Sequence, residues 1–169
     1  MRGRRALVVV GALAATATPA AADEPPFTIG GQPAWFVMAG ATAGGTVAID
    51  TRGGFVGGEV SLARVVEAHY LGLYVDAYRD FGVDGTYLTF GPELGWVRRS
   101  RTLPVSLGLD GGGAVRFSDE RALGATGRVF FVVAGTVALF ARYAYLDAAE
   151  DDHVVQLGVT MKFPMWRVR

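Results

Sequence analysis

The chain has 169 residues with 16 basic and 16 acidic side chains, so its formal net charge is zero. No basic face is evident, which argues against nucleic acid as a partner, and the absence of cysteine excludes disulfides and thiolate metal sites. Glycine is frequent, at 24 residues, and the mean hydropathy is +0.30. Beyond the N-terminal segment, however, no apolar run reaches the roughly 20 residues that a membrane-spanning helix needs.

Residues 1–22 have the features of a secretory signal peptide. Three arginines precede an apolar stretch at 6–15, and small residues at 20–22 resemble a cleavage site. We expect this segment to be removed on export, the alternative being an uncleaved N-terminal anchor. The rest of the chain is mildly acidic, because those arginines leave with the signal peptide.

A short Pro-rich lead at 23–33 is followed by segments of about ten residues in which apolar and polar side chains alternate. A period of two predicts β-strands, each with one apolar and one polar face. In the clearest segment Leu71, Leu73 and Val75 alternate with Tyr74 and Asp76. The expected strands lie near residues 34–44, 55–64, 69–79, 86–97, 103–113, 122–132, 136–146 and 153–163.

Eight amphipathic strands joined by polar or glycine-bearing turns predict an all-β fold, an eight-stranded antiparallel up-and-down barrel formed by residues 34–163. Residues 164–169 would follow as a periplasmic extension. The links after the second, fourth and sixth strands are short, which is typical of the periplasmic rim of a membrane barrel. The longer links would then face the outside.

The composition of the polar face indicates that this face lines the barrel interior. It consists mostly of small residues and tyrosine with few charges, whereas a water-facing surface carries many. The apolar face would then contact lipid, which makes the barrel transmembrane. Unpaired buried charges are costly, so we expect an internal ion-pair network, although some members could instead be solvated at the rims. Its expected members are Glu59, Asp76, Glu93, Asp110, Arg128, Arg142 and Lys162.

Aromatic side chains cluster near the ends of the expected strands, as in the interfacial girdles of membrane barrels. The expected periplasmic girdle contains Trp35, Trp96, Phe131, Phe163 and Trp166. The expected outer girdle contains Phe55, Phe81, Tyr87, Phe117, Tyr143 and Tyr145.

The last expected strand carries a spaced pattern of a polar residue, glycine, an apolar residue and an aromatic: Gln156, Gly158, Met161 and Phe163. This pattern resembles the C-terminal assembly signal of bacterial outer-membrane proteins, which implies recognition by the barrel-assembly machinery. The signal usually ends the protein, whereas six residues follow it here. With the strand count, the chain resembles small outer-membrane barrels of the OmpA/OmpX kind. That resemblance implies a monomer among outer-membrane lipids of a Gram-negative bacterium.

We expect no catalytic, cofactor or metal site. His69 and His153 would lie at opposite ends of the barrel, and neither has the serine two residues on that a lipid A deacylase requires. No general base is evident for the candidate nucleophiles Ser61, Ser106 and Ser118. An acidic loop at 147–152 could hold a divalent cation weakly, but a solvated loop is the favoured interpretation.

The expected function is therefore that of a non-enzymatic outer-membrane barrel with a structural or surface-interaction role. Its lumen is expected to be filled by side chains, so no open pore is predicted. Two alternatives remain open at this point. One is a soluble periplasmic or secreted barrel that binds an apolar ligand, and the other is a lipid A-modifying barrel enzyme.

Overall fold

The computed structural model describes residues 28–29, 32–48, 51–66, 68–98, 105–119, 121–134, 136–147 and 152–168. The expected signal peptide and most of the lead lie outside the described residues. None of the described residues forms a helix long and apolar enough to cross a membrane. The strands are β1 (Thr28–Ile29), β2 (Gln32–Val47), β3 (Arg52–Val66), β4 (His69–Asp80), β5 (Gly85–Arg98), β6 (Val105–Phe117), β7 (Ala122–Val133), β8 (Val137–Asp147) and β9 (His153–Val168).

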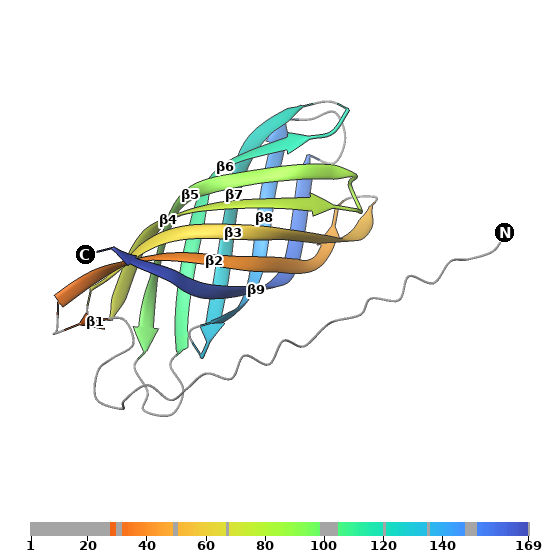
Figure 1. Ribbon diagram of the computed structural model, residues 1–169. Helices are drawn as coiled ribbons and strands as arrows, with labels where there is room; N and C mark the ends of the chain where they lie inside the picture. Colours follow the sequence, from red (N-terminus) through yellow and green to blue (C-terminus); the bar gives the residue numbers. More distant parts are fainter. Residues whose placement is uncertain are drawn as a thin grey trace.

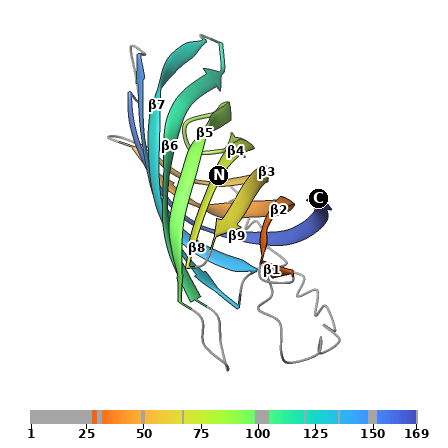
Figure 2. The ribbon, with the colours of Figure 1, turned by 90° about the vertical axis from the view of Figure 1, so that its left-hand side faces the viewer.

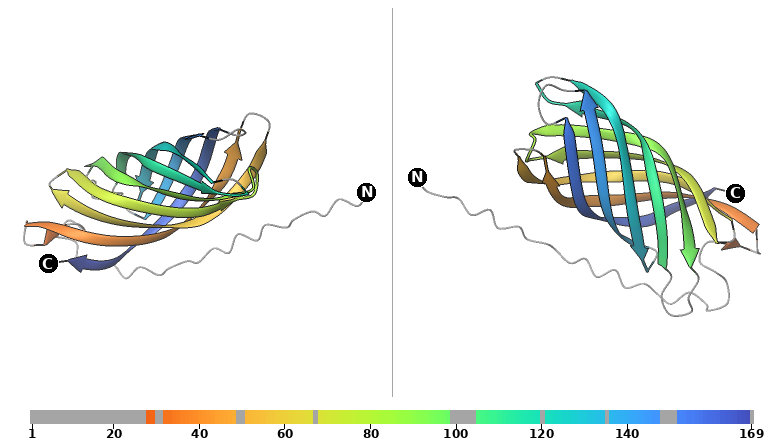
Figure 3. Two further views of the ribbon diagram at one scale, coloured as in Figure 1. Left: turned by 90° about the horizontal axis from the view of Figure 1, so that it is seen from above. Right: turned by 180° about the vertical axis from the view of Figure 1, so that it is seen from behind.

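Strands β2 to β9 form a closed barrel (Figure 1). Each pairs antiparallel with the next in the chain, and β2 also pairs with β9. The strands at the front of Figure 1 cross over those at the back, and the view from behind brings the back strands forward (Figure 3). Such a tilt accompanies barrel closure. The prediction of an eight-stranded antiparallel up-and-down barrel is confirmed.

The barrel has two ends that differ in what they carry. The first, here called the terminus end, holds the start of β2, the end of β9 and the connections β3–β4, β5–β6 and β7–β8. The short β1 also lies there, beside the start of β2 (Figure 2). The second, here called the far end, holds the connections β2–β3, β4–β5, β6–β7 and β8–β9.

The link lengths do not distinguish the two ends as the sequence predicted. The longest connection between barrel strands, residues 99–104, lies at the terminus end, where short links were expected. At the far end the strands extend into segments that look like turns, since Gly45 and Gly54 are paired across β2 and β3. Two successive glycines often mark a turn. Here, however, both Gly-Gly dipeptides lie in paired strands.

Strand β9 continues beyond Phe163, so the prediction that residues 164–169 form an extension outside the barrel is wrong as far as Val168. Met38 pairs with Pro164, and Val37 pairs with Trp166 across a register shift. Proline has no N–H to donate, and an irregular point in the ladder is where a strand tolerates it. The first part of β2, from Trp35 to Met38, supplies the partner for this last part of β9.

Glycine in the lumen makes room for aromatic rings. Gly44 faces Gly158 across the β2–β9 pair. A Cβ atom on Gly44 would lie 2.8 Å from the Phe55 ring, and one on Gly158 would lie 2.7 Å from the Phe140 ring. Phe55 and Phe140 are themselves in contact, with ring centroids 6.0 Å apart. The glycines therefore let this part of the barrel core close.

Candidate functional site

The two faces of the barrel have opposite polarity. Leu71, Leu73 and Leu157 point outward and are 61–63% exposed, whereas Asp76 and Arg142 point inward and are at most 2% exposed. The same division follows the alternation along all eight barrel strands. A water-soluble barrel has the reverse arrangement, so the described surface is that of a barrel whose solvent is apolar.

One group of ionic side chains crosses the lumen around Arg128. Arg128 Nη1 donates to Glu59 Oε2 at 2.5 Å, and Arg128 Nε donates to Asp110 Oδ2 at 2.6 Å. Lys162 pairs with Glu59, and its Nζ lies 3.4 Å from Glu93 Oε2. These five residues, here called the Arg128 cluster, come from β3, β5, β6, β7 and β9. All five belong to the ion-pair network that the sequence predicts.

A second group lies nearer the far end. Arg142 pairs with Asp76, and its Nη1 lies 3.4 Å from Gln156 Oε1. Gln156 Nε2 donates to Asp80 at 2.9 Å, and Thr46 also donates to Asp80. These five residues are here called the Arg142 cluster. The structure thus places the seven predicted network residues in the lumen and divides them between two clusters.

Sequence reasoning missed three members of the Arg142 cluster. Asp80 lies one residue beyond the expected end of its strand, and Thr46 lies two residues beyond the expected end of its strand. Gln156 lies on the polar face of its expected strand but was not part of the predicted ion-pair network; it is 1% exposed and faces the lumen. Its alternation with Val155 and Leu157 was the available signal for that position.

Aromatic rings fill the lumen around both clusters. The Tyr78 and Tyr87 rings are stacked with centroids 4.9 Å apart. The Arg142 guanidinium carbon lies 4.8 Å from the Tyr78 ring centroid, and that of Arg128 lies 5.2 Å from the Tyr74 ring centroid. Such cation–π contacts help to keep a desolvated cation in place. The guanidinium groups and aromatic rings together fill the middle of the lumen.

Two residues expected in the outer girdle are lumen residues instead. Phe55 is 3% exposed and Tyr87 is fully buried. Phe55 has the same alternation phase as Glu59, and Tyr87 the same phase as Glu93, so each faces inward with that carboxylate. An aromatic residue near a strand end therefore lies at the membrane interface only if its side chain also points to the outer face.

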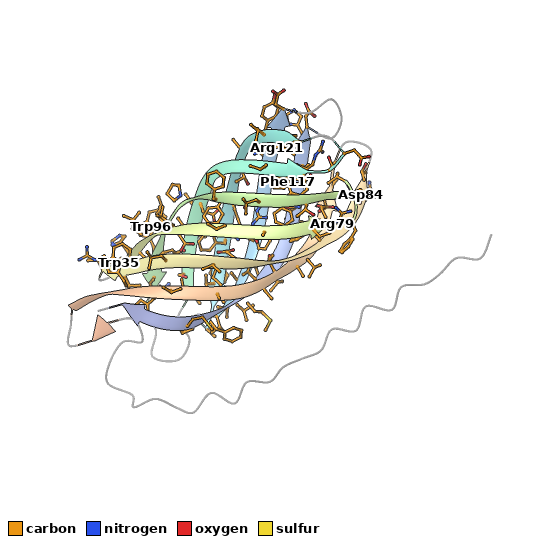
Figure 4. All side chains as sticks on the ribbon, turned by 45° about the horizontal axis from the view of Figure 1, so that its top comes forward. Trp35, Arg79, Asp84, Trp96, Phe117 and Arg121 are labelled. Atoms are coloured by element: carbon orange, nitrogen blue, oxygen red, sulfur yellow. The ribbon has the colours of Figure 1, made fainter. Side chains whose placement is uncertain are left out.

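The remaining described girdle residues are exposed on the outer surface near the ends (Figure 4). Trp35 and Trp96 lie toward the terminus end, and Phe117 lies toward the far end near Arg121. The guanidinium carbon of Arg121 is 5.7 Å from the Phe117 ring centroid. Also exposed are Phe131 and Phe163 on the first side and Phe81, Tyr143 and Tyr145 on the second. The Trp166 side chain lies outside the described residues.

The histidines lie at opposite ends of the barrel. The His69 ring meets the Trp96 ring edge-on at 6.4 Å near the terminus end. At the far end His153 Nδ1 is 2.5 Å from Tyr143 Oη, and its Nε2 is 3.6 Å from Asp152 Oδ2. Of the acidic loop, residues 148–151 lie outside the described residues. The described residues contain no group of three or more His, Cys, Asp or Glu placed to hold a metal ion.

The three candidate serines lie at different levels of the barrel. Ser61 is buried in the lumen, where Lys162 Nζ lies 3.5 Å from its Oγ. Ser106 lines the lumen near the terminus end, and Ser118 follows β6 at the far end. The assembly-signal residues all lie on β9, where Gln156 points inward while Met161 and Phe163 are exposed outward. Their role as a signal stays a prediction.

No protein-family profile matches the chain, and no curated protein is similar enough in sequence to match it. The fold is similar to the crystal structure of Neisserial surface protein A, with a TM-score of 0.53 and 15% identity over 78% of this chain and 97% of that one. Two structures of the attachment invasion locus protein Ail of Yersinia pestis, one in complex with the heparin analogue sucrose octasulfate, also match. Their TM-scores are 0.36 and 0.37, with 15% and 14% identity over 78% of this chain and 99% of theirs. The chain thus has the fold of the small eight-stranded outer-membrane barrels of the OmpA/OmpX kind.

Proposed function

We propose that the chain is a non-enzymatic outer-membrane barrel with a structural or surface-interaction role and no open pore. The observation that carries this proposal is the polarity of the two faces. Large apolar side chains are exposed on all eight barrel strands, while the charged side chains of the two clusters are buried inside. In a lipid bilayer the apolar outer face contacts acyl chains, while the charged side chains stay inside the barrel, away from the lipid.

The size of the apolar surface supports lipid as its partner. Each large aliphatic side chain removed from water contributes about 1.5–3 kcal/mol, and soluble monomers rarely expose apolar patches beyond about 300–600 Å². Here the apolar side chains run around the whole barrel. The barrel strands have 11 to 16 residues, enough to cross a bilayer, which takes about 9–11 residues of tilted strand.

The packed lumen supports the absence of an open pore. The Arg128 cluster joins strands on opposite sides of the barrel, and the Arg142 cluster does the same nearer the far end. An eight-stranded barrel has an interior just wide enough for its side chains. Passage of a solute would require these ion pairs to separate inside a low-dielectric lumen, where separated charges are costly.

The far end is the proposed interaction surface. Its described rim exposes Tyr143 and Tyr145, whose ring centroids lie 5.9 Å and 5.2 Å from that of His153. Aromatic residues are enriched at protein interfaces. Because the far-end connections are short, a partner would contact the rim of the barrel rather than long loops. We propose a monomer, exported by its signal peptide and assembled through β9.

No observation favours the lipid A-modifying alternative, since the contacts of the two histidines within the described residues are with Trp96, Tyr143, Tyr145 and Asp152. The soluble alternative would require the apolar face to point inward, whereas Leu71 and Leu73 point outward. Neither alternative is therefore retained as a second candidate function.

Electrophoresis of the isolated outer membrane tests the proposal. The full precursor is expressed in a Gram-negative host, and the detergent-solubilised protein is run in SDS with and without boiling. We expect the protein in the outer-membrane fraction with a heat-dependent change in migration, because a closed barrel resists cold SDS. Protein found in the soluble periplasm, with no change on heating, would overturn the proposal.

A further inference from the structure

A cavity lies inside the barrel at the terminus end. The centres of water molecules can occupy a volume of about 80 Å³ in it. This is room for roughly five to eight water molecules, since each needs about 10–15 Å³ of such volume. Its walls are mostly apolar and include Phe36, Met38, Val65, Val97, Phe130 and Val132. Its inner part is formed by polar side chains, namely Tyr70, Glu93, Arg128 and Lys162.

The charges at the inner part of this cavity do not balance. The Arg128 cluster contains three carboxylates, those of Glu59, Glu93 and Asp110, but only two cations. Arg128 is held by Glu59 and Asp110, and Lys162 is held by Glu59. Within the described residues, Glu93 has one ion-pair contact, the longer one of 3.4 Å with Lys162. The Arg142 cluster and the Arg116 side chain belong to the other half of the lumen.

Three carboxylate oxygens of the cluster, on Glu59, Glu93 and Asp110, have no hydrogen-bond partner among the described residues, and Glu93 is the one of these residues that lines the cavity. It is 1% exposed, and its Oε1 atom is buried without a hydrogen-bond partner in the part of the chain that the structure describes. The Tyr70 hydroxyl, which lines the same cavity, is likewise buried without a partner there. A buried carboxylate oxygen without a donor is unfavourable. The cluster thus has one more carboxylate than cations, and at the cavity both Glu93 Oε1 and the Tyr70 hydroxyl are without a partner among the described residues.

We infer that this cavity binds a small alkylammonium ion, with the ammonium group against the Glu93 carboxylate and the alkyl chain along the apolar walls. The ammonium supplies the missing positive charge, donates to Glu93 Oε1 and can donate to the Tyr70 hydroxyl oxygen. A carboxylate ligand would add a fourth negative charge, and a neutral apolar ligand would leave Glu93 Oε1 unpaired. The volume suits a chain of about four carbons, by comparison with the waters it could replace.

The binding test uses n-butylammonium chloride as the probe and the full protein as isolated. The protein is taken in a neutral maltoside detergent, or without detergent if it is found in the soluble fraction, so the result does not depend on the proposed membrane location. Calorimetric titration compares n-butylammonium with n-butanol and butyrate. We expect n-butylammonium to bind at least about tenfold more tightly than either, as a charge-assisted hydrogen bond implies.

Three variants locate the site. Glu93→Gln keeps the shape but removes the charge and is expected to weaken n-butylammonium binding about tenfold or more. Val132→Phe fills the cavity and is expected to abolish binding. Val129→Phe, on the same strand with its side chain on the outer face, is the matched control and is expected to bind as the parent protein does.

Equal affinity for n-butanol and n-butylammonium, or tighter binding of butyrate, would overturn the inference. So would unchanged binding in Glu93→Gln or in Val132→Phe. Folding of Glu93→Gln is judged by the heat-dependent change in migration or by circular dichroism. If this variant does not fold, n-butylammonium binding is compared in Val132→Phe and Val129→Phe, and equal binding in the two would overturn the inference.

Discussion

Arg128 Nη1 lies 2.5 Å from Glu59 Oε2, although 69 positions separate the two residues in the chain. Arg128 is on β7 and Glu59 is on β3, so the ion pair crosses the lumen rather than joining neighbouring strands. Both side chains are at most 2% exposed. The pair therefore forms only when the barrel closes, and it links closure of the backbone to neutralisation of the buried charges.

Loss of Arg128 is expected to be strongly destabilising. In Arg128→Met, Glu59 and Asp110 lose their guanidinium partner while staying buried, and removing one partner of a buried pair costs about 3–5 kcal/mol. Urea unfolding of the detergent-solubilised protein measures this change. Arg79→Met is the control, because the Arg79–Asp84 pair is exposed and such pairs contribute about 0–1 kcal/mol. Equal changes in the two variants would contradict the burial of the Arg128 cluster in the lumen.

A charge on the middle of the outer face is expected to be costly only if that face meets lipid. Leu73→Arg places a cation near the middle of β4, where transfer into a bilayer costs about 2–4 kcal/mol. Val47→Arg, at the end of β2, is expected to cost only about 0–1 kcal/mol. Unfolding in phospholipid vesicles compares the two variants. A cost for Leu73→Arg no larger than that for Val47→Arg would count against a membrane-facing surface.

Gly44 is expected to tolerate no side chain. A Cβ atom there would lie 2.1 Å from the Leu157 carbonyl oxygen, whereas one on Gly45 would meet nothing closer than 3.8 Å. Gly44→Ala must therefore shift the β2–β9 pair and is expected to cost about 1–3 kcal/mol, as overpacking does. Gly45→Ala is expected to behave as the parent protein does. Thermal unfolding followed by the heat-dependent migration in SDS measures both, and equal stabilities would show that the β2–β9 contact is looser than described.

Phe163 is expected to matter for assembly more than for stability. Phe163 and Phe131 are both exposed on the outer face near the terminus end, at 44% and 43%. If β9 carries the assembly signal, Phe163→Ala should lower the fraction of barrel assembled in cells, while Phe131→Ala should not. Both variants should refold equally well in detergent, where no machinery is present. An equal assembled fraction in cells would remove Phe163 from the signal.

The alternation of residue types was enough to predict the strands and the two faces. Side chains in a strand point alternately to opposite sides, so the sequence alone puts Glu59, Glu93 and Arg128 on one face and Leu71 and Leu73 on the other. The number of such segments and the scarcity of charges on the polar face then indicate a membrane barrel. The local geometry of a strand suffices for these conclusions.

The ends of the strands depend on what lies beside them. Gly45, Gly54 and Pro164 are turn or breaker residues by type, yet each lies in a paired strand. A strand continues for as long as a neighbour satisfies its backbone N–H and C=O groups, and that neighbour can lie at the other end of the chain. For this reason the sequence placed the strand boundaries and the link lengths less well than the strands themselves.

The sequence by itself determined the fold class and which face of each strand enters the lumen, because both follow from a period of two along each strand. Only the tertiary structure decided which side chains of these faces meet. The tilt and register of a closed barrel bring Glu59 to Arg128 and Asp76 to Arg142, pairs that lie 69 and 66 positions apart. The same closure leaves Glu93 with an unpaired oxygen beside a cavity. Contacts across a lumen are set by the geometry of all eight strands together, which no local pattern contains.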